Sequence, residues 1–170
     1  MTMNVLVAYA TKNGSTASIA RMIAEALDEQ GLRAEARPAA EVADAGAYDA
    51  VILGSALYAN RWLPDARQFA RRHQSELDAR PVWLFSSGPL DASAHERDIP
   101  PVRGAVRAGH RLDARQHVTF GGRLEEGASG WIARMLLKQG RGGDFRDEGQ
   151  IRSWAQGIAA ELATEGAVER

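Results

Sequence analysis

Six consecutive residues near the N-terminus have side chains suited to holding a phosphate group. They follow a short apolar run and precede a stretch with helical periodicity, and they are Thr11, Lys12, Asn13, Gly14, Ser15 and Thr16. The loop offers hydroxyls, an amide and a flexible glycine, and it leads directly into a helix N-terminus. The free N–H groups and the positive dipole end of a helix attract anions there. The loop therefore indicates a site for a single phosphate monoester, with Lys12 as the nearby cation.

Other phosphate-binding motifs do not fit this loop. A P-loop requires a lysine directly after its second glycine, whereas Lys12 precedes Gly14. A dinucleotide fingerprint requires three glycines, and the loop has one. The acidic residues of a response-regulator receiver are missing from the ends of the first and third predicted strands. A low-molecular-weight phosphatase would place a cysteine in the loop, and the chain has no cysteine.

Two further loops follow predicted strands and add to the candidate site. The first consists of Ser55, Ala56, Leu57, Tyr58, Ala59 and Asn60. The second consists of Ser86, Ser87, Gly88, Pro89, Leu90 and Asp91. Small residues let the backbone approach a planar ligand, and Tyr58 and Trp62 offer rings that could stack on it. Together the three loops predict a phosphate site beside a flat, partly apolar slot, which suits flavin mononucleotide (FMN).

Strand-like and helix-like segments alternate along the chain and would position these loops. The predicted strands span Asn4 to Tyr9, Leu32 to Arg37, Asp49 to Ser55, Pro81 to Ser86 and Arg115 to Phe120. The predicted helices span Ala17 to Gln30, Pro64 to His73, Val102 to His110 and Gly149 to Leu162. Such alternation predicts an α/β fold with helices on both faces of a parallel sheet. Five strands suit an open, doubly wound sheet in a single domain, residues 1–170, better than an eight-stranded barrel.

Composition excludes several classes of function. The chain has 170 residues, with 21 basic and 22 acidic side chains and a net charge of −1, so nucleic acid is not expected as its main partner. The absence of cysteine excludes disulfides, thiolate zinc sites and thiol redox chemistry. The histidines lack metal-ligand spacing, so no metal is expected. No apolar run reaches a membrane span and no signal peptide is visible, so a cytoplasmic location is expected.

The segment from Val5 to Thr16 resembles the phosphate-loop signature of the flavodoxin family. More narrowly it is similar to the flavodoxin-domain branch that includes menaquinone-dependent protoporphyrinogen dehydrogenase. The segments that carry this narrower resemblance are Gly54 to Tyr58, Phe85 to Gly88, Phe120 to Leu124, Gly143-Asp144 and Ile151 to Ala155. The resemblance covers nearly the whole chain and implies a flavodoxin-like sheet of order 2-1-3-4-5 with FMN as cofactor.

The resemblance leaves three functions open. One is an FMN oxidoreductase that oxidises a protoporphyrinogen-like small molecule and passes electrons to a quinone. Another is a flavodoxin-type electron carrier that serves a redox partner protein. The third is a binding module without FMN, against which the intact phosphate loop argues.

Two departures from a standard flavodoxin bear on the choice between these functions. Asn13 replaces a threonine, and the loop from Ser55 to Trp62 carries Arg61 and no carboxylate. A cation near the flavin would favour its anionic reduced form and raise its potential. The segment Gly127 to Arg141 has a basic amphipathic pattern, which fits either packing on the sheet or docking on an anionic membrane.

Overall fold

Continuous apolar runs form the centre of a parallel β-sheet. The computed structural model describes residues 2–12, 14–58, 61–88, 102–120 and 148–168. Its parallel strands lie in the order β2-β1-β3-β5-β6. They span Asn4–Ala10 (β1), Arg33–Pro38 (β2), Ala50–Tyr58 (β3), Val82–Ser87 (β5) and His117–Phe120 (β6). The apolar runs of β1, β3 and β5 are covered on both faces, whereas β2 alternates in burial as an edge strand does.

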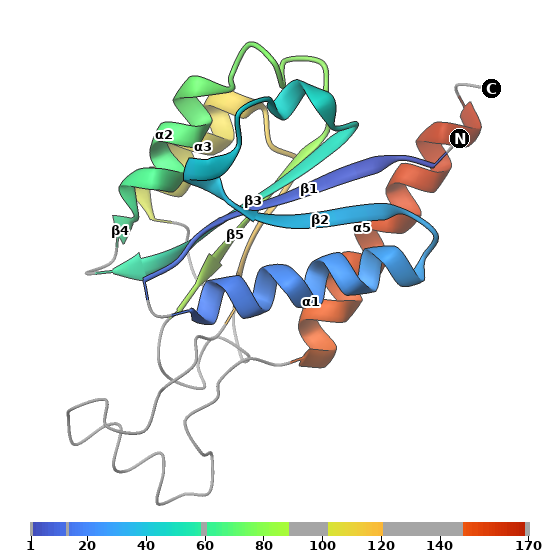
Figure 1. The fold of residues 1–170 in the computed structure, drawn as a ribbon, viewed down its shortest axis with the longest axis horizontal. Coiled ribbons are helices and arrows are strands. Elements are labelled where there is room, and N and C mark those ends of the chain that lie inside the picture. Colours follow the sequence, from blue (N-terminus) through green and yellow to red (C-terminus); the bar gives the residue numbers. More distant parts are fainter. Residues whose placement is uncertain (1, 13, 59–60, 89–101, 121–147, 169–170) are drawn as a thin grey trace, which may run out of the picture.

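Helices cover both faces of this sheet, as the sequence predicts for a doubly wound α/β fold. The helices α1 (Ser15–Glu29) and α5 (Glu148–Val168) lie on one face, and α2 (Pro64–Arg72) and α3 (Arg103–Leu112) lie on the other (Figure 1). Two short 3-10 helices, η1 (Ala39–Glu41) and η2 (Ala45–Ala47), connect β2 to β3. Within the described residues, no helix combines the length and the apolar character needed to cross a membrane.

One detail of the sheet differs from the predicted order. A two-residue strand, β4 (Arg61–Trp62), turns back and pairs antiparallel with the end of β3. The pairs are Leu57 with Trp62 and Tyr58 with Arg61, so β3 has a hydrogen-bonding partner beyond Ser55, where the strand was predicted to end. Ala56, Leu57 and Tyr58 therefore belong to a strand rather than to a loop. A hairpin this short has no periodicity from which the sequence could predict it.

The helix boundaries agree with the predicted ones to within two residues except at the end of α5. That helix continues to Val168, six residues past the predicted end at Leu162. Arg115, near the end of the connection from α3 to β6, forms ion pairs with Glu161 and Glu165 of α5. These contacts give the last turns of α5 a polar partner, whereas the prediction followed only the apolar stripe.

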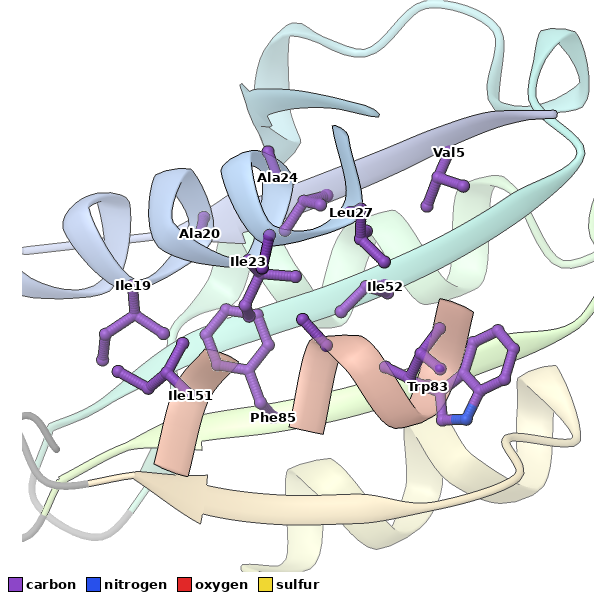
Figure 2. Close-up of a cluster of buried hydrophobic side chains, with 14 of the residues drawn as sticks. Val5, Ile19, Ala20, Ile23, Ala24, Leu27, Ile52, Trp83, Phe85 and Ile151 are labelled. Atoms are coloured by element: carbon purple, nitrogen blue, oxygen red, sulfur yellow. The ribbon is translucent and has the colours of Figure 1, made fainter. Parts of the chain in front are cut away.

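The side chains between the sheet and the α1–α5 face form the larger hydrophobic core. Ile23 and Leu27 of α1 pack there with Ile52, Phe85 and Ile151, all essentially inaccessible to solvent (Figure 2). Gly31 follows Gln30, the C-cap of α1, and has a φ of 89°. The N–H groups of the two residues after the C-cap return to the carbonyls of residues 28 and 27, which is a Schellman motif.

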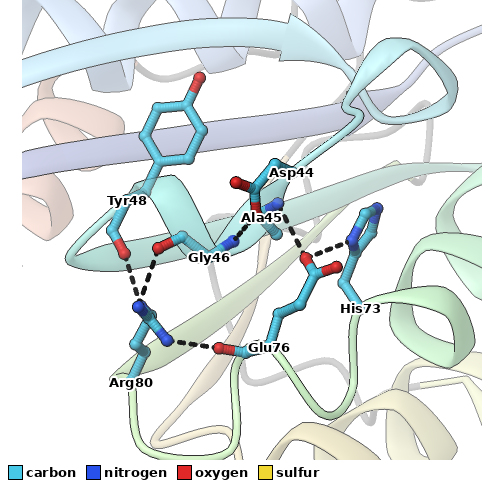
Figure 3. Close-up of polar contacts among 7 residues, drawn as sticks. All are labelled: Asp44, Ala45, Gly46, Tyr48, His73, Glu76 and Arg80. Atoms are coloured by element: carbon cyan, nitrogen blue, oxygen red, sulfur yellow. Dashed lines mark hydrogen bonds and ion pairs between the residues drawn. The ribbon is translucent and has the colours of Figure 1, made fainter.

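A polar network fixes the connection between β2 and β3 against the turn that follows α2. Arg80 donates to the backbone carbonyls of Tyr48 and Gly46 at 2.7 and 2.8 Å (Figure 3). The Glu76 carboxylate accepts from the Ala45 N–H at 2.9 Å and contacts His73 Nδ1 at 2.8 Å. The hydrogen bonds from His73 and the backbone hold the pKa of Glu76 below its usual value. The network thus satisfies backbone groups that a 3-10 connection leaves unpaired.

One prediction cannot be compared with this fold. The basic amphipathic segment Gly127 to Arg141 lies outside the described residues.

Candidate functional site

The three predicted loops begin at one edge of the sheet. Ala10 of β1 pairs with Ser55 of β3, and Ser55 pairs with Ser86 of β5. Because these strands are parallel, their carboxyl ends meet at the edge where α1 begins (Figure 1). Ligands of doubly wound sheets bind at this edge, where the chain order of the strands reverses on either side of β1. The register therefore brings the starts of all three segments together.

The first loop is shaped by its own backbone. The Thr11 Oγ1 accepts a hydrogen bond from the Gly14 N–H at 2.9 Å, so Thr11 organises the turn. Gly14 is the N-cap of α1 and has a φ of 86°, a conformation that glycine adopts without strain. Gly14 has no side chain with which to cap the helix, and no acidic residue occupies the first turn of α1. Within that turn, the positive end of the α1 dipole therefore has no carboxylate of the kind that such ends favour. Ser15 is the first residue of the helix, and Asn13 lies outside the described residues.

Thr16 carries the most informative side chain of this loop. It lies in the first turn of α1 and is fully buried. Its Oγ1 has no hydrogen-bond partner among the residues that the structure describes. Burying an unpaired hydroxyl costs roughly 1–3 kcal/mol, so such groups normally have a partner. A hydroxyl in the first turn of a helix, without a partner among the described residues, fits the oxygens of a bound phosphate.

Lys12 connects the first loop to the end of β3. Its Nζ lies 3.3 Å from the centroid of the Tyr58 ring, which is a cation–π contact. The Tyr58 side chain is 56% exposed, a high value for an aromatic residue. These two residues bring a positive charge and an accessible ring to the same edge.

The second and third segments pack directly on each other. Gly88 has a φ of 131°, and a Cβ added there would lie 3.3 Å from the Leu57 Cβ. The Gly88 N–H donates to the carbonyl of Phe120 at 2.7 Å. Ala56 and Leu57 remain partly exposed, while Ser87 is buried. Ala59, Asn60, Pro89, Leu90 and Asp91 lie outside the described residues.

The hydroxyls of Ser55 and Ser86 are engaged inside the protein. The Ser55 Oγ accepts from the Leu63 N–H and donates to the Ala56 carbonyl, both at 2.9 Å. The Ser86 Oγ accepts from the Trp62 Nε1–H at 2.8 Å. Both hydroxyls therefore hold β4 against the sheet, and only the backbone of these two residues is left to contact a ligand.

Stacking of Trp62 on a ligand is a prediction that the structure contradicts. The Trp62 side chain is 1% exposed and packs in the core between the sheet and the α2–α3 face. The reason is the β4 hairpin, in which Arg61 faces solvent and Trp62 turns inward, where Ser86 accepts its N–H. Tyr58 is the aromatic residue that the described part of the chain offers at this edge.

His117 belongs to the same internal network and was not singled out by the sequence. Its Nε2 lies 2.7 Å from the Ser86 Oγ. Burial lowers the pKa of His117 to about 4, so its ring is neutral at neutral pH. Nothing in the spacing of the four histidines distinguishes this one. The described residues contain no group of three or more histidine, aspartate or glutamate side chains placed to hold a metal ion.

Comparisons with known proteins agree with this geometry. A family model described as a flavodoxin domain matches residues 6–141. No curated protein matches the chain. A short-chain flavodoxin associated with a non-canonical PDU bacterial microcompartment is a structural neighbour with 15% identity and a TM-score of 0.63, covering 94% of this chain and 98% of that one. A flavodoxin from the domain Archaea has 10% identity and a TM-score of 0.64, over 95% and 99% of the two chains.

A larger protein contains a similar unit. The rubredoxin oxygen:oxidoreductase of the anaerobe Desulfovibrio gigas matches with 16% identity and a TM-score of 0.64. The match covers 96% of this chain and 37% of that protein, so this chain spans just over a third of its length. At these identities the structural neighbours show that the fold is shared.

Proposed function

Because the chain belongs to the flavodoxin-domain family, we propose that it is an FMN-binding redox protein whose first loop, Thr11 to Thr16, holds the cofactor phosphate. The observation that carries this proposal is the buried Thr16 hydroxyl in the first turn of α1, which has no hydrogen-bond partner among the described residues. Doubly wound sheets in general bind ligands at this edge, and flavodoxin with its FMN is one example. The position of the loop at the edge therefore does not by itself identify the ligand. The Thr16 hydroxyl supports the proposal independently.

Each segment would have a separate task in holding the cofactor. The N–H groups at the start of α1 and the Thr16 hydroxyl would bind the phosphate, with Gly14 permitting the turn. Tyr58, Leu57 and the backbone of Gly88 would border the ring system. FMN when bound supplies the transfer of one or two electrons, and the protein supplies its orientation and electrostatic surroundings.

Lys12 and Arg61 would set the electrostatic surroundings of the site. Lys12 lies on the Tyr58 ring, and Arg61 is exposed and pairs with Tyr58 through β4. Cations near the ring system favour negative charge on it. We therefore expect a potential above that of a flavin surrounded by carboxylates.

Two finer activities remain as proposals. One is the oxidation of a protoporphyrinogen-like substrate with a quinone as acceptor, supported by the resemblance of several short segments to that dehydrogenase branch. The other is electron transfer to a partner protein. The exposed Tyr58 and Arg61 at the edge of the site favour it, because they leave the site accessible to a protein surface.

One experiment tests the proposal and separates the two activities. The purified protein, supplied with FMN, should show the absorption bands of a bound oxidised flavin. Protoporphyrinogen is then added with menadione as acceptor, and porphyrin fluorescence is followed. Turnover that depends on both FMN and menadione supports the dehydrogenase. Its absence, with reduction of the bound flavin by a reductase and reoxidation by a protein acceptor, supports the carrier. A protein that binds no flavin contradicts the proposal.

A further inference from the structure

Arginines line a cavity on the α2–α3 face of the molecule. The cavity has a volume of about 390 Å³ and lies between α2, α3 and β4. The arginines that line it are Arg61, Arg67, Arg71, Arg103, Arg107 and Arg111. All six side chains are exposed. We call this cavity the arginine groove. Its positive charge stands out in a chain whose net charge is −1.

The spacing of these arginines places them in rows. Arg67 and Arg71 are four residues apart on α2, and Arg103, Arg107 and Arg111 follow at intervals of four on α3. Residues four apart lie on the same helix face, so the like charges in each row repel one another and destabilise the helix that carries them. Arg103 also lies in the first turn of α3, where the helix dipole disfavours a cation. Arg71 and Arg111 lie in the last turns of α2 and α3, where the dipole favours a cation, so helix stability accounts for these two arginines and not for the like charges along each row.

The groove arginines have no carboxylate partners within the described part of the chain. The polar contact there is between Arg111 and the Gln74 Oε1, at 3.2 Å. Other arginines of the same molecule do pair with carboxylates: Arg37 with Glu35, Arg115 with Glu161 and Glu165, and Arg152 with Glu29. The groove thus concentrates positive charge that the described residues leave unneutralised.

At the floor of the groove, α3 packs closely against β4 and α2. A Cβ on Gly104 would lie 3.1 Å from the Trp62 Cβ and 3.5 Å from the Arg67 Cδ. The absence of a side chain at Gly104 therefore lets α3 approach β4 and the stem of Arg67. Trp62, Ala70 and Ala108 form the apolar floor. Flexible charged side chains above an apolar floor suit the surface of a protein partner.

The groove adjoins the candidate cofactor site at Arg61. Arg61 lines the groove and pairs through β4 with Tyr58, whose ring holds Lys12. A partner seated on the arginines would therefore reach the edge where the flavin is proposed to bind. Opposite charges on the two surfaces would speed their encounter and orient the complex.

We propose that the arginine groove docks an acidic segment of the protein that exchanges electrons with this one. The proposal rests on the proposed flavin-dependent function, since it names the chemistry of the partner. The charge of the groove and its place beside the candidate site argue for this occupant.

A labelled peptide tests the groove directly. A fluorescein-labelled, glutamate-rich peptide is titrated with the protein and its fluorescence anisotropy is followed, beside a peptide with glutamine at every glutamate. The double variant Arg67→Gln/Arg107→Gln is compared with Arg21→Gln/Arg72→Gln, which removes the same charge from exposed arginines outside the groove. We expect the groove variant to bind the acidic peptide roughly 3- to 20-fold more weakly and the control variant less than about 2-fold more weakly. Added salt should weaken binding of the wild-type protein.

Several results would overturn the proposal. These are equal losses in the two variants, equal binding of the glutamine peptide, or tighter binding of a labelled single-stranded DNA, which would make the groove a nucleic-acid site. Circular dichroism spectra of both variants show whether the fold is retained. If the groove variant is misfolded, Arg67→Lys/Arg107→Lys keeps the charge and should bind the peptide within about 3-fold of wild type. Weak binding of that variant would contradict a docking role based on charge.

Failure of the proposed function is distinguishable from failure of this proposal. The peptide titration is run with and without FMN, and FMN affinity is measured separately on the groove variant, where we expect no change. One outcome is that the protein binds no FMN but binds the peptide through the groove arginines. This outcome would contradict the proposed flavin function and would still support an acidic ligand in the groove. The other outcome is that the protein binds FMN but the groove variant binds the peptide as tightly as the wild type. This outcome would contradict the docking proposal alone.

Discussion

At the scale of single residues, hydroxyls of the same type have different tasks. Thr11 shapes the first loop through the Gly14 N–H, and Ser55 and Ser86 hold the β4 hairpin. The Thr16 hydroxyl is buried and has no partner among the described residues. The sequence shows that these side chains can donate and accept hydrogen bonds, but their partners depend on which face of the sheet each one points toward. The continuous apolar runs of β3 and β5 carry no such information, because both faces are buried.

The burial of His117 leads us to expect that the stability of the folded protein depends on pH. Its pKa is about 4 in the folded protein and near 6.5 when exposed, so the unfolded chain binds a proton that the native state does not. The free energy of unfolding should therefore fall by roughly 2–3 kcal/mol between about pH 6.5 and pH 4. Urea unfolding across this range measures it. The variant His117→Gln should lose most of this slope, whereas His110→Gln, at an exposed position, should keep it. Identical slopes in all three proteins would show that His117 does not stay neutral.

At the scale of elements, the strands that are buried on both faces could be predicted and the short hairpin could not. The apolar runs of β1 and β3 are long enough to indicate buried strands, and the apolar stripe of α1 is long enough to show a helical period. By contrast, β4 consists only of Arg61 and Trp62, and its position depends on a hydrogen bond to the Ser86 hydroxyl of β5, which is distant in sequence. The end of α5 depends likewise on Arg115. Such features arise from tertiary contacts that a local pattern does not contain.

Gly54 permits the packing of β3 on its neighbour. A Cβ added there would lie 2.0 Å from the Phe85 ring, which is fully buried. We expect Gly54→Ala to destabilise the fold by about 3 kcal/mol or more, since the ring has no space to move into. Gly157→Ala is the matched control, because no atom lies within 4 Å of the added Cβ, and it should stabilise α5 by about 0.5–1 kcal/mol. Thermal unfolding compares the two variants. Gly54→Ala with wild-type stability would contradict the close contact.

At the scale of the whole molecule, the strand order determines which loops meet. β1 lies between β2 and β3, so the segments after β1, β3 and β5 begin side by side. The sequence predicts this meeting from the alternation of elements, and the register confirms it. The arginine groove arises at the same scale, since its residues come from β4, α2 and α3. No single segment of the sequence predicts it.

The affinity of the protein for FMN, compared with riboflavin, tests the central claim most directly. Riboflavin has the same ring system and no phosphate, so the difference between the two affinities reports on the phosphate site. Thr16→Val removes only the buried hydroxyl. It should weaken FMN binding by roughly 1–3 kcal/mol, or about 5- to 150-fold, leave riboflavin binding unchanged, and not lower the stability of the protein without FMN, in which the buried hydroxyl has no partner among the described residues. The control is Thr164→Val, on the exposed face of α5. Fluorescence titration should show FMN bound far more tightly than riboflavin, with a smaller difference in Thr16→Val; equal affinities for the two flavins in the wild-type protein would contradict the account.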